Sequence, residues 1–253
     1  MARKQVSASQ VLNTRKGTRD SLNEDAPRAS WQLFMDFNEL VIVEADSPII
    51  ENAGSQNAAD PAIIVAERGE IRLQAGDGNG TVAQDGSQFC TVVPVQADSG
   101  NLAFECRVNI ADISEVSLYV GFTDVTTLEE PMSVAATTLT TVCSDGFGFV
   151  YDSAMSVAGW VCAGVDSNTD ATGEGLSDAT APADGVYQVL RAEVNAAGTF
   201  AEFFVDGVKV HELTDKVCTP TVNMYFTVCL TGDGSNSAGE YAFVDYFLVS
   251  HDR

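Results

Sequence analysis

Residues 186–213 read Val-Tyr-Gln-Val-Leu-Arg-Ala-Glu-Val-Asn-Ala-Ala-Gly-Thr-Phe-Ala-Glu-Phe-Phe-Val-Asp-Gly-Val-Lys-Val-His-Glu-Leu, and this stretch decides the fold class. Apolar Leu190, Ala192 and Val194 alternate with charged residues, the period of a strand with one buried face. We therefore expect three successive strands, over residues 187–194, 199–205 and 208–213.

The turn between the second and third of these strands carries the strongest local signal. Asp206-Gly207 stands between two β-branched runs, and a type I′ hairpin turn needs positive φ at both central residues. About a dozen short alternating runs, separated by turn residues, follow one another along the chain, with no convincing helix and no internal repeat. The pattern predicts one all-β sandwich or barrel domain.

Two segments are expected to lack strands. Residues 45–60 have a loop-like composition, and residues 125–140 are rich in threonine and alanine and contain Pro131. We expect a loop in the first segment and a long loop or short helix in the second.

Charge divides the chain into an arm and a body. The whole chain carries −23 at neutral pH, but residues 1–29 hold six basic against three acidic groups, so the body over residues 30–253 carries −26. The basic residues of the arm are Arg3, Lys4, Arg15, Lys16, Arg19 and Arg28. The arm is interpreted either as an extended anchor on an acidic neighbour or as a solvated terminus.

The same charge balance excludes several classes of partner. Nucleic acid and anionic membranes require clustered lysine and arginine, which the acidic body lacks. No apolar run approaches the roughly 20 residues of a membrane helix, and no secretory signal precedes the body. We therefore expect a protein that is made in a cytoplasm.

The six cysteines are Cys90, Cys106, Cys143, Cys162, Cys218 and Cys229. They are widely spaced, without any Cys-x-x-Cys, and only two histidines accompany them. Free, buried thiols are favoured over disulfides, and a structural zinc site is not expected.

Four segments together carry a family resemblance: residues 102–124, 146–166, 187–213 and 241–249. They contain Val-Gly-Phe-Thr-Asp, Gly-Phe-Gly-Phe-Val-Tyr-Asp, Trp-x-x-x-x-Val-Asp, the Phe-Phe-Val-Asp-Gly hairpin and a closing Val-Asp-Tyr strand, in that order. This order resembles the concanavalin A-like lectin/glucanase jelly roll, in the form found among tailed-bacteriophage decoration and cement proteins.

The resemblance implies a non-enzymatic structural virion protein. On this hypothesis the arm binds the major capsid protein or a sister subunit, the protein forms a homo-oligomer, with a trimer favoured, and it sits on the capsid surface after synthesis in the host cytoplasm. The alternative is a carbohydrate-binding adhesion module on the virion, in which Trp160 and Tyr151 would stack on glycans. Packing between the sheets is the favoured interpretation of these two rings.

No catalytic constellation or cofactor motif is found. Glucanases of the resembling family carry Glu-x-Asp-x-x-Glu on one strand, and the nearest match, which begins at Glu44 and ends at Glu51, has different spacing. The weak metal candidate is a calcium loop formed by Asp166, Asn168 and Asp170, with an acidic solvated loop as the favoured interpretation.

Overall fold

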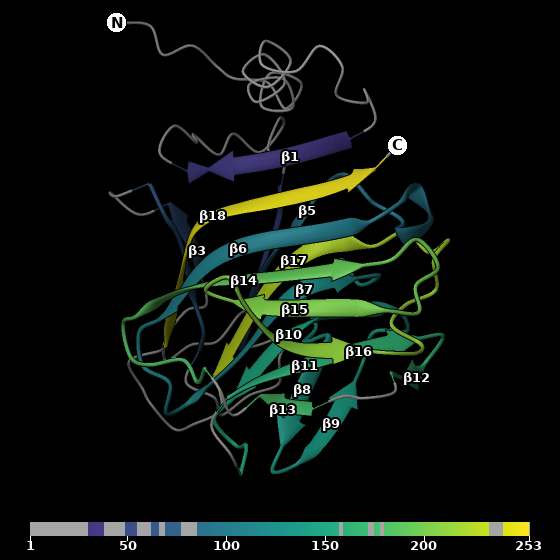
Figure 1. Ribbon diagram of the computed structural model, residues 1–253. Coiled ribbons are helices and arrows are strands. Elements are labelled where there is room, and N and C mark those ends of the chain that lie inside the picture. The colour runs from purple at the N-terminus through teal and green to yellow at the C-terminus, as the bar shows by residue number, and fades with distance from the viewer. Residues whose placement is uncertain are drawn as a thin grey trace, which may run out of the picture.

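Two antiparallel sheets packed face to face form the body of the molecule (Figure 1). The computed structural model describes residues 30–37, 49–54, 62–65, 69–76, 85–156, 159–171, 175–177, 180–232 and 240–252. The six basic residues of the arm lie outside these ranges.

The first sheet, called sheet A, has eight strands and faces the viewer in Figure 1. Its order is β16 (Val208–Leu213), β15 (Ala201–Val205), β14 (Tyr187–Val194), β6 (Leu102–Ile110), β18 (Tyr241–Asp252), β4 (Ile71–Gln74) and β3 (Ala62–Val65), with β1 (Ser30–Asp36) also paired to β18. The chain therefore places β6, from its middle, between β14 and the closing strand β18.

The second sheet, called sheet B, also has eight strands. Its order is β12 (Thr169–Asp170), β11 (Trp160–Asp166), β10 (Gly146–Asp152), β7 (Val116–Thr123), β17 (Tyr225–Gly232), β5 (Ser87–Thr91) and β2 (Ile49–Ala53), with β13 (Gly175–Ser177) paired to β11. A separate hairpin consists of β8 (Met132–Ala135) and β9 (Thr138–Thr141), and a 3-10 helix spans Ala97–Ser99. No helix in the described residues is long and apolar enough to span a membrane.

Phenylalanine rings fill the space between the sheets. Phe226 of sheet B lies 5.3 Å from Phe104 and 4.9 Å from Phe247, both of sheet A, between ring centroids. These rings are fully buried, and aromatic rings bring the largest apolar area to a core. The expected all-β sandwich is confirmed.

The stretch from which the fold class was inferred forms β14, β15 and β16 in meander order. Leu190, Ala192 and Val194 point into the core, as expected. Asp206 has φ of 51° and Gly207 has φ of 78°, so both central residues of the turn have the positive φ of the expected hairpin.

The expectations for the two supposed loops were wrong. The segment 45–60 contains β2, and the segment 125–140 contains the β8–β9 hairpin except for the last residue of β9. Both strands of that hairpin are four residues long, and a run so short gives little periodicity to detect.

Residues 124–145, called the strap, connect β7 to β10 and cross the outer face of sheet B. The Asn52 side chain of β2 donates to the Thr126 carbonyl at one edge (2.9 Å), and Thr141 of the strap donates to Asp170 of β12 at the other (3.2 Å). Between these edges lies a second buried apolar cluster, made of Tyr119, Met132, Val134, Cys143, Val150, Val161, Ala163, Val165 and Cys229. The strap therefore covers this face from edge to edge.

Paired glycines bring β7 and β10 close together beneath the strap. Gly121 and Gly148 are register partners, and a Cβ on Gly121 would lie 2.3 Å from the Phe147 carbonyl oxygen. The Tyr119 hydroxyl donates to the Phe122 carbonyl at 2.7 Å. The repeated glycines in Val-Gly-Phe-Thr-Asp and Gly-Phe-Gly-Phe-Val-Tyr-Asp thus serve close backbone approach.

All six cysteines are buried, as expected, and none of them forms a disulfide in the structure. Burial raises the pKa of all six thiols. The pKa rises to about 11 for Cys90 and to about 12 for Cys143 and Cys218. The thiols therefore stay protonated at neutral pH.

Candidate functional site

The outer face of sheet A differs sharply from that of sheet B. We call it the aromatic face and define it by residues from four neighbouring strands and the residue before β4: Glu70, Arg72, Glu105, Arg107, Tyr187, Tyr241, Asp245 and Tyr246. All eight side chains are partly accessible to solvent. The strand period places most of them there, because they alternate with buried residues of the core.

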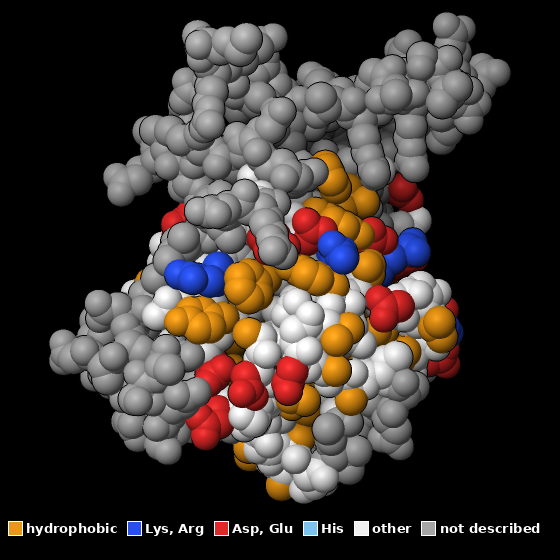
Figure 2. Space-filling view, turned by 90° about the vertical axis from the view of Figure 1, so that its left-hand side faces the viewer, with side chains coloured by type: hydrophobic (Ala, Val, Ile, Leu, Met, Phe, Trp, Pro, Cys, Tyr) orange, Lys and Arg blue, Asp and Glu red, His pale blue; other side chains and the backbone are white. Residues whose placement is uncertain are grey.

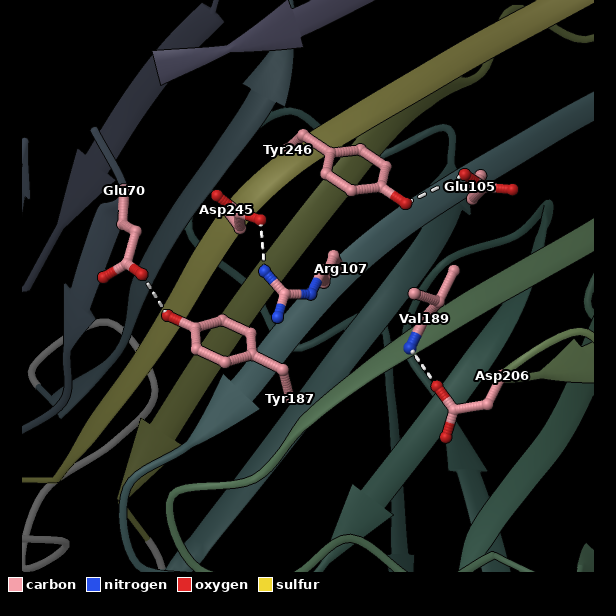
Figure 3. Close-up of polar contacts among 8 residues, drawn as sticks. All are labelled: Glu70, Glu105, Arg107, Tyr187, Val189, Asp206, Asp245 and Tyr246. Carbon is pink, nitrogen blue, oxygen red and sulfur yellow. Dashed lines mark hydrogen bonds and ion pairs between the residues drawn. The ribbon is translucent and has the colours of Figure 1, made fainter. Parts of the chain in front are cut away.

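A β-bulge on β18 concentrates polar groups on this face. The register between β18 and β6 shifts between Val244 and Tyr246, so the extra residue breaks the strict alternation. As a result both Asp245 and Tyr246 point outward, although they are consecutive. Figure 3 shows the two side chains leaving β18 toward partners on β6.

Arg107 lies at the centre of the aromatic face (Figure 3). Its guanidinium donates to the Asp245 carboxylate at 2.5 Å and lies 4.2 Å from the centroid of the Tyr187 ring. The planar guanidinium therefore forms an ion pair and a stacking contact together, as lysine could not. Because the Arg107 and Asp245 side chains are 38% and 27% exposed, the ion pair fixes geometry more than it adds stability.

Two tyrosines are fixed by carboxylates at their hydroxyl ends. The Tyr187 hydroxyl donates to Glu70, and the Tyr246 hydroxyl donates to Glu105 at 3.0 Å. Burial, and then the hydrogen bond to a neighbouring carboxylate, raise the pKa of Tyr246 to about 12 and raise that of Tyr187 further. Both rings are therefore held as neutral donors in one orientation.

Three arginine–aromatic pairs cross sheet A in a row. Arg72 lies over Tyr241 at 5.0 Å, Arg107 over Tyr187 at 4.2 Å and Arg191 over Phe204 at 5.4 Å. Such pairs occur about once in 70–80 residues of ordinary structures, so about three are expected in a chain of 253 residues. What distinguishes these three is that they all lie on the outer face of one sheet. Figure 2, turned so that the left side of Figure 1 faces the viewer, shows Lys or Arg side chains lying beside hydrophobic and acidic ones.

The two rings proposed from the sequence for glycan stacking lie elsewhere. Trp160 is fully buried and Tyr151 is 4% exposed, and the two pack edge to face at 6.0 Å. The Trp160 indole N–H donates to Gln188 at 3.0 Å. Neither ring offers a face to a ligand, so the favoured packing interpretation is confirmed and the stacking proposal for these residues is corrected.

The residues of the calcium candidate lie on β11, a turn and β12. Asp166 accepts a hydrogen bond from the Thr219 hydroxyl at 2.6 Å, and Asp170 accepts one from Thr141 at 3.2 Å. Asn168 adopts φ of 61°, as a turn residue. Within the described ranges, no three His, Cys, Asp or Glu side chains are grouped closely enough to hold a metal ion, so these residues support loop structure.

Within the Glu44–Glu51 segment, only residues 49–51 lie within the described residues. Glu51 lies on the edge strand β2, while Glu44 and Asp46 lie outside the described residues. The glucanase motif of the resembling family is therefore not found on a described central strand.

Sequence reasoning missed the aromatic face. The alternation of residues 187–194 predicts this strand, but its outward residues include no metal cluster or nucleophile and so do not by themselves indicate a site. The residues that complete the face come from β6, β18 and β4, which lie in distant parts of the chain. A usable signal was present: four of the seven basic residues of the body (Arg72, Arg107, Arg191 and Lys209) fall at outward positions of predicted strands, in an otherwise acidic domain.

Comparison with solved structures identifies the fold. A β-glucanase of Bacillus licheniformis matches with a TM-score of 0.58 and 13% identity, over 86% of this chain and 97% of its own. The Emp47p carbohydrate recognition domain matches with a TM-score of 0.60 and 10% identity, over 90% and 96%. The metal-free Emp46p carbohydrate recognition domain matches with a TM-score of 0.58 and 11% identity, over 85% and 94%.

No protein-family model and no curated protein sequence matches this chain. The structural matches include enzymes and binding domains alike, so they establish the architecture and leave the activity open. The chain has the concanavalin A-like jelly-roll fold.

Proposed function

We propose that this protein is a non-enzymatic carbohydrate-recognition domain that binds its ligand on the aromatic face. The observation that carries the proposal is the contrast between the two outer faces: sheet B is covered by the strap, while sheet A presents tyrosines, arginines and carboxylates to solvent. The glucanase and the carbohydrate recognition domains that share the fold support a sugar as the ligand.

The chemistry of the face suits a sugar. Tyrosine combines an apolar ring, suited to sugar C–H groups, with a polar hydroxyl at its edge. Carboxylates and guanidinium groups supply acceptors and donors for sugar hydroxyls. Because Tyr187 and Tyr246 are already held by Glu70 and Glu105, binding costs little additional ordering.

A hydrolytic role is less well supported, because hydrolysis needs two available carboxylates. Glycosidases place them about 5–9.5 Å apart, one as a proton donor and one as a nucleophile or base. Glu70 and Glu105 each accept a tyrosine hydroxyl, and Asp245 is paired with Arg107. The described carboxylates of the aromatic face are thus engaged in holding its rings and its arginine.

A glycan array tests the proposal. The intact protein is expected to bind a subset of glycans, and Tyr187→Ala combined with Tyr246→Ala is expected to remove that binding. Tyr225→Ala on sheet B is the matched control, since it removes a half-buried tyrosine from the other sheet. The proposal is contradicted if the intact protein binds no glycan on the array. It is also contradicted if the double variant binds glycans as well as the intact protein does.

The separation of charge in the sequence favours a second candidate, a capsid decoration protein. The net charge is +3 on the arm and −26 on the body, so the arm of one molecule could bind the acidic body of a neighbouring molecule. The bacteriophage resemblance suggests the major capsid protein, or another copy within a trimer, as the partner. On this proposal the protein resides on the virion surface and stabilises it by buried contact area.

Deletion of residues 1–28 tests this second candidate directly. The full chain is expected to bind expanded, undecorated capsids, and the truncated chain is expected to bind them much more weakly. Equal binding by both chains would refute anchoring by the arm. Glycan binding by the truncated chain should be unchanged, so the two candidates are tested separately.

A further inference from the structure

The backbones of Tyr187 and Tyr246 are separated by more than the width of one sugar ring. They stand on β14 and β18, with β6 between them, and neighbouring strands lie about 4.8 Å apart, which gives about 10 Å across the sheet. Tyr187 is opposite Asn109 and Tyr246 is opposite Arg107, which adds about 7 Å along the strands at about 3.4 Å per residue. Both side chains reach across the sheet, since Tyr187 contacts Glu70 and Tyr246 contacts Glu105. We therefore expect a ligand that contacts both rings to contain at least two linked sugars.

We propose, on the basis of the function proposed above, that the aromatic face binds an extended, uncharged oligosaccharide that crosses strands β14, β6 and β18. One sugar stacks on Tyr187, another stacks on Tyr246, and Arg107 lies beneath the chain between them. The face is the outer surface of a sheet (Figure 1), so a polysaccharide can cross it without ending there.

Charge on the face and on the surrounding body favours an uncharged chain over an anionic one. The aromatic face and its neighbour pair Arg191–Glu193 carry three arginines and four carboxylates, a net charge near zero in a body of −26. The negative charge of the surrounding body would repel an anionic polysaccharide, whereas a neutral chain experiences no such repulsion. The internal ion pair of Arg107 with Asp245 further leaves little free charge at the centre.

An unpaired acceptor lies under the same contact. Asn109 is 7% exposed, and its side-chain oxygen has no hydrogen-bond partner in the described structure. It occupies the outward position of β6 between Tyr187 and Phe243. A buried acceptor without a donor is unfavourable, and a sugar hydroxyl that reaches it would supply the missing donor.

Titration with a size series tests the inference. The probes are neutral glucose and mannose oligosaccharides of one to six units, β-linked and α-linked, measured by isothermal titration calorimetry with the full chain. Affinity is expected to rise about tenfold or more between one and four sugar units and then to level off. A tenfold rise corresponds to about 1.4 kcal/mol of binding free energy. Chelation of metal ions should leave the affinity unchanged.

Variants locate the two contacts. Tyr187→Ala and Tyr246→Ala are each expected to lower affinity for the hexamer about tenfold and to leave the weak monosaccharide affinity less affected. Tyr187→Phe retains the ring and should lose less than Tyr187→Ala, whereas Tyr225→Ala should match the intact protein. Thermal unfolding of each variant confirms that the fold is retained.

The outcomes separate this inference from the broader proposal. If a single sugar binds as tightly as the hexamer, or if a uronic-acid oligomer binds more tightly than a neutral one, carbohydrate binding stands and the extended neutral chain is overturned. If no oligosaccharide binds and the glycan array is also blank, the proposed function itself fails. If the tyrosine variants change only the oligomeric state, the face is an interface between copies and both are overturned.

Discussion

The guanidinium of Arg107 lies 4.2 Å from the centroid of the Tyr187 ring, while the same side chain holds Asp245. These three residues come from β6, β14 and β18, so one arginine ties together the strands that form the centre of sheet A. The arrangement fixes one face of the tyrosine ring from below and leaves its hydroxyl to Glu70. It is the structural basis of a preformed binding surface.

Replacement of Arg107 tests this arrangement. Arg107→Ala is expected to lower the free energy of unfolding by only about 1 kcal/mol, because the pair is partly exposed, yet to weaken oligosaccharide binding about tenfold. Urea unfolding and calorimetric titration measure the two effects. Arg191→Ala removes a similar arginine–aromatic pair outside the proposed contact, and its binding should remain that of the intact protein; equal loss in both variants would contradict the assignment.

Trp160 should matter for stability and not for binding. Trp160→Phe removes the indole donor to Gln188 and leaves a small void in a fully buried site, which is expected to cost about 1–3 kcal/mol of unfolding free energy. Chemical denaturation measures the loss. If Trp160→Phe has normal stability but no longer binds glycans, Trp160 contacts the ligand and this account is wrong.

Gly121→Ala tests the close approach of β7 and β10. The added methyl would meet the Phe147 carbonyl oxygen and the Gly148 backbone, so a loss of about 2–3 kcal/mol or failure to fold is expected. Gly185→Ala is the control: its Cβ meets open space, but its φ of 67° costs about 1–2 kcal/mol. Equal losses in the two variants would show that the contact between the strands is looser than described.

Thiol reactivity tests the cysteine assignment. All six thiols are buried and free, so a disulfide reagent such as Ellman's reagent should react slowly with the native protein and release six equivalents after denaturation without reductant. Burial raises the thiol pKa values, which slows the native reaction further. Recovery of four or fewer equivalents would demonstrate a disulfide.

Alkaline pH should destabilise the fold. Folding raises the pKa of Cys90 from 9.0 to about 11, that of Cys143 from 9.0 to about 12 and that of Tyr246 from 10.0 to about 12. Above pH 9 the unfolded chain loses protons that the folded chain retains, so stability is fully present below that pH and declines between pH 9 and 12. Guanidinium unfolding at pH 7, 9, 10 and 11 measures the decline; constant stability to pH 11 would contradict it.

The sequence predicts the parts of this fold that depend on local chemistry. Alternation from Leu190 to Val194 and the Asp206-Gly207 turn require only neighbouring residues. The strap could not be predicted in the same way, because its short strands gain stability from a buried cluster that distant residues such as Val161 and Cys229 complete.

The sequence indicates the aromatic face only in part, for a related reason. The bulge beside Val244 reverses the inside–outside alternation of β18. The sequence around Val244 contains no residue type that predicts a bulge. Trp160 and Tyr151 drew attention as large rings, yet burial is decided by which sheet face the rings occupy, and both lie on the inner face of sheet B.

Fluorine NMR of the protein labelled with 3-fluorotyrosine tests the central claim most directly. The chain has six tyrosines, of which Tyr187, Tyr241 and Tyr246 lie on the aromatic face and Tyr119, Tyr151 and Tyr225 belong to sheet B. When a binding oligosaccharide is added, we expect the signals of Tyr187 and Tyr246 to shift and those of the three sheet B tyrosines to stay in place. Shifts confined to the sheet B tyrosines would contradict the account.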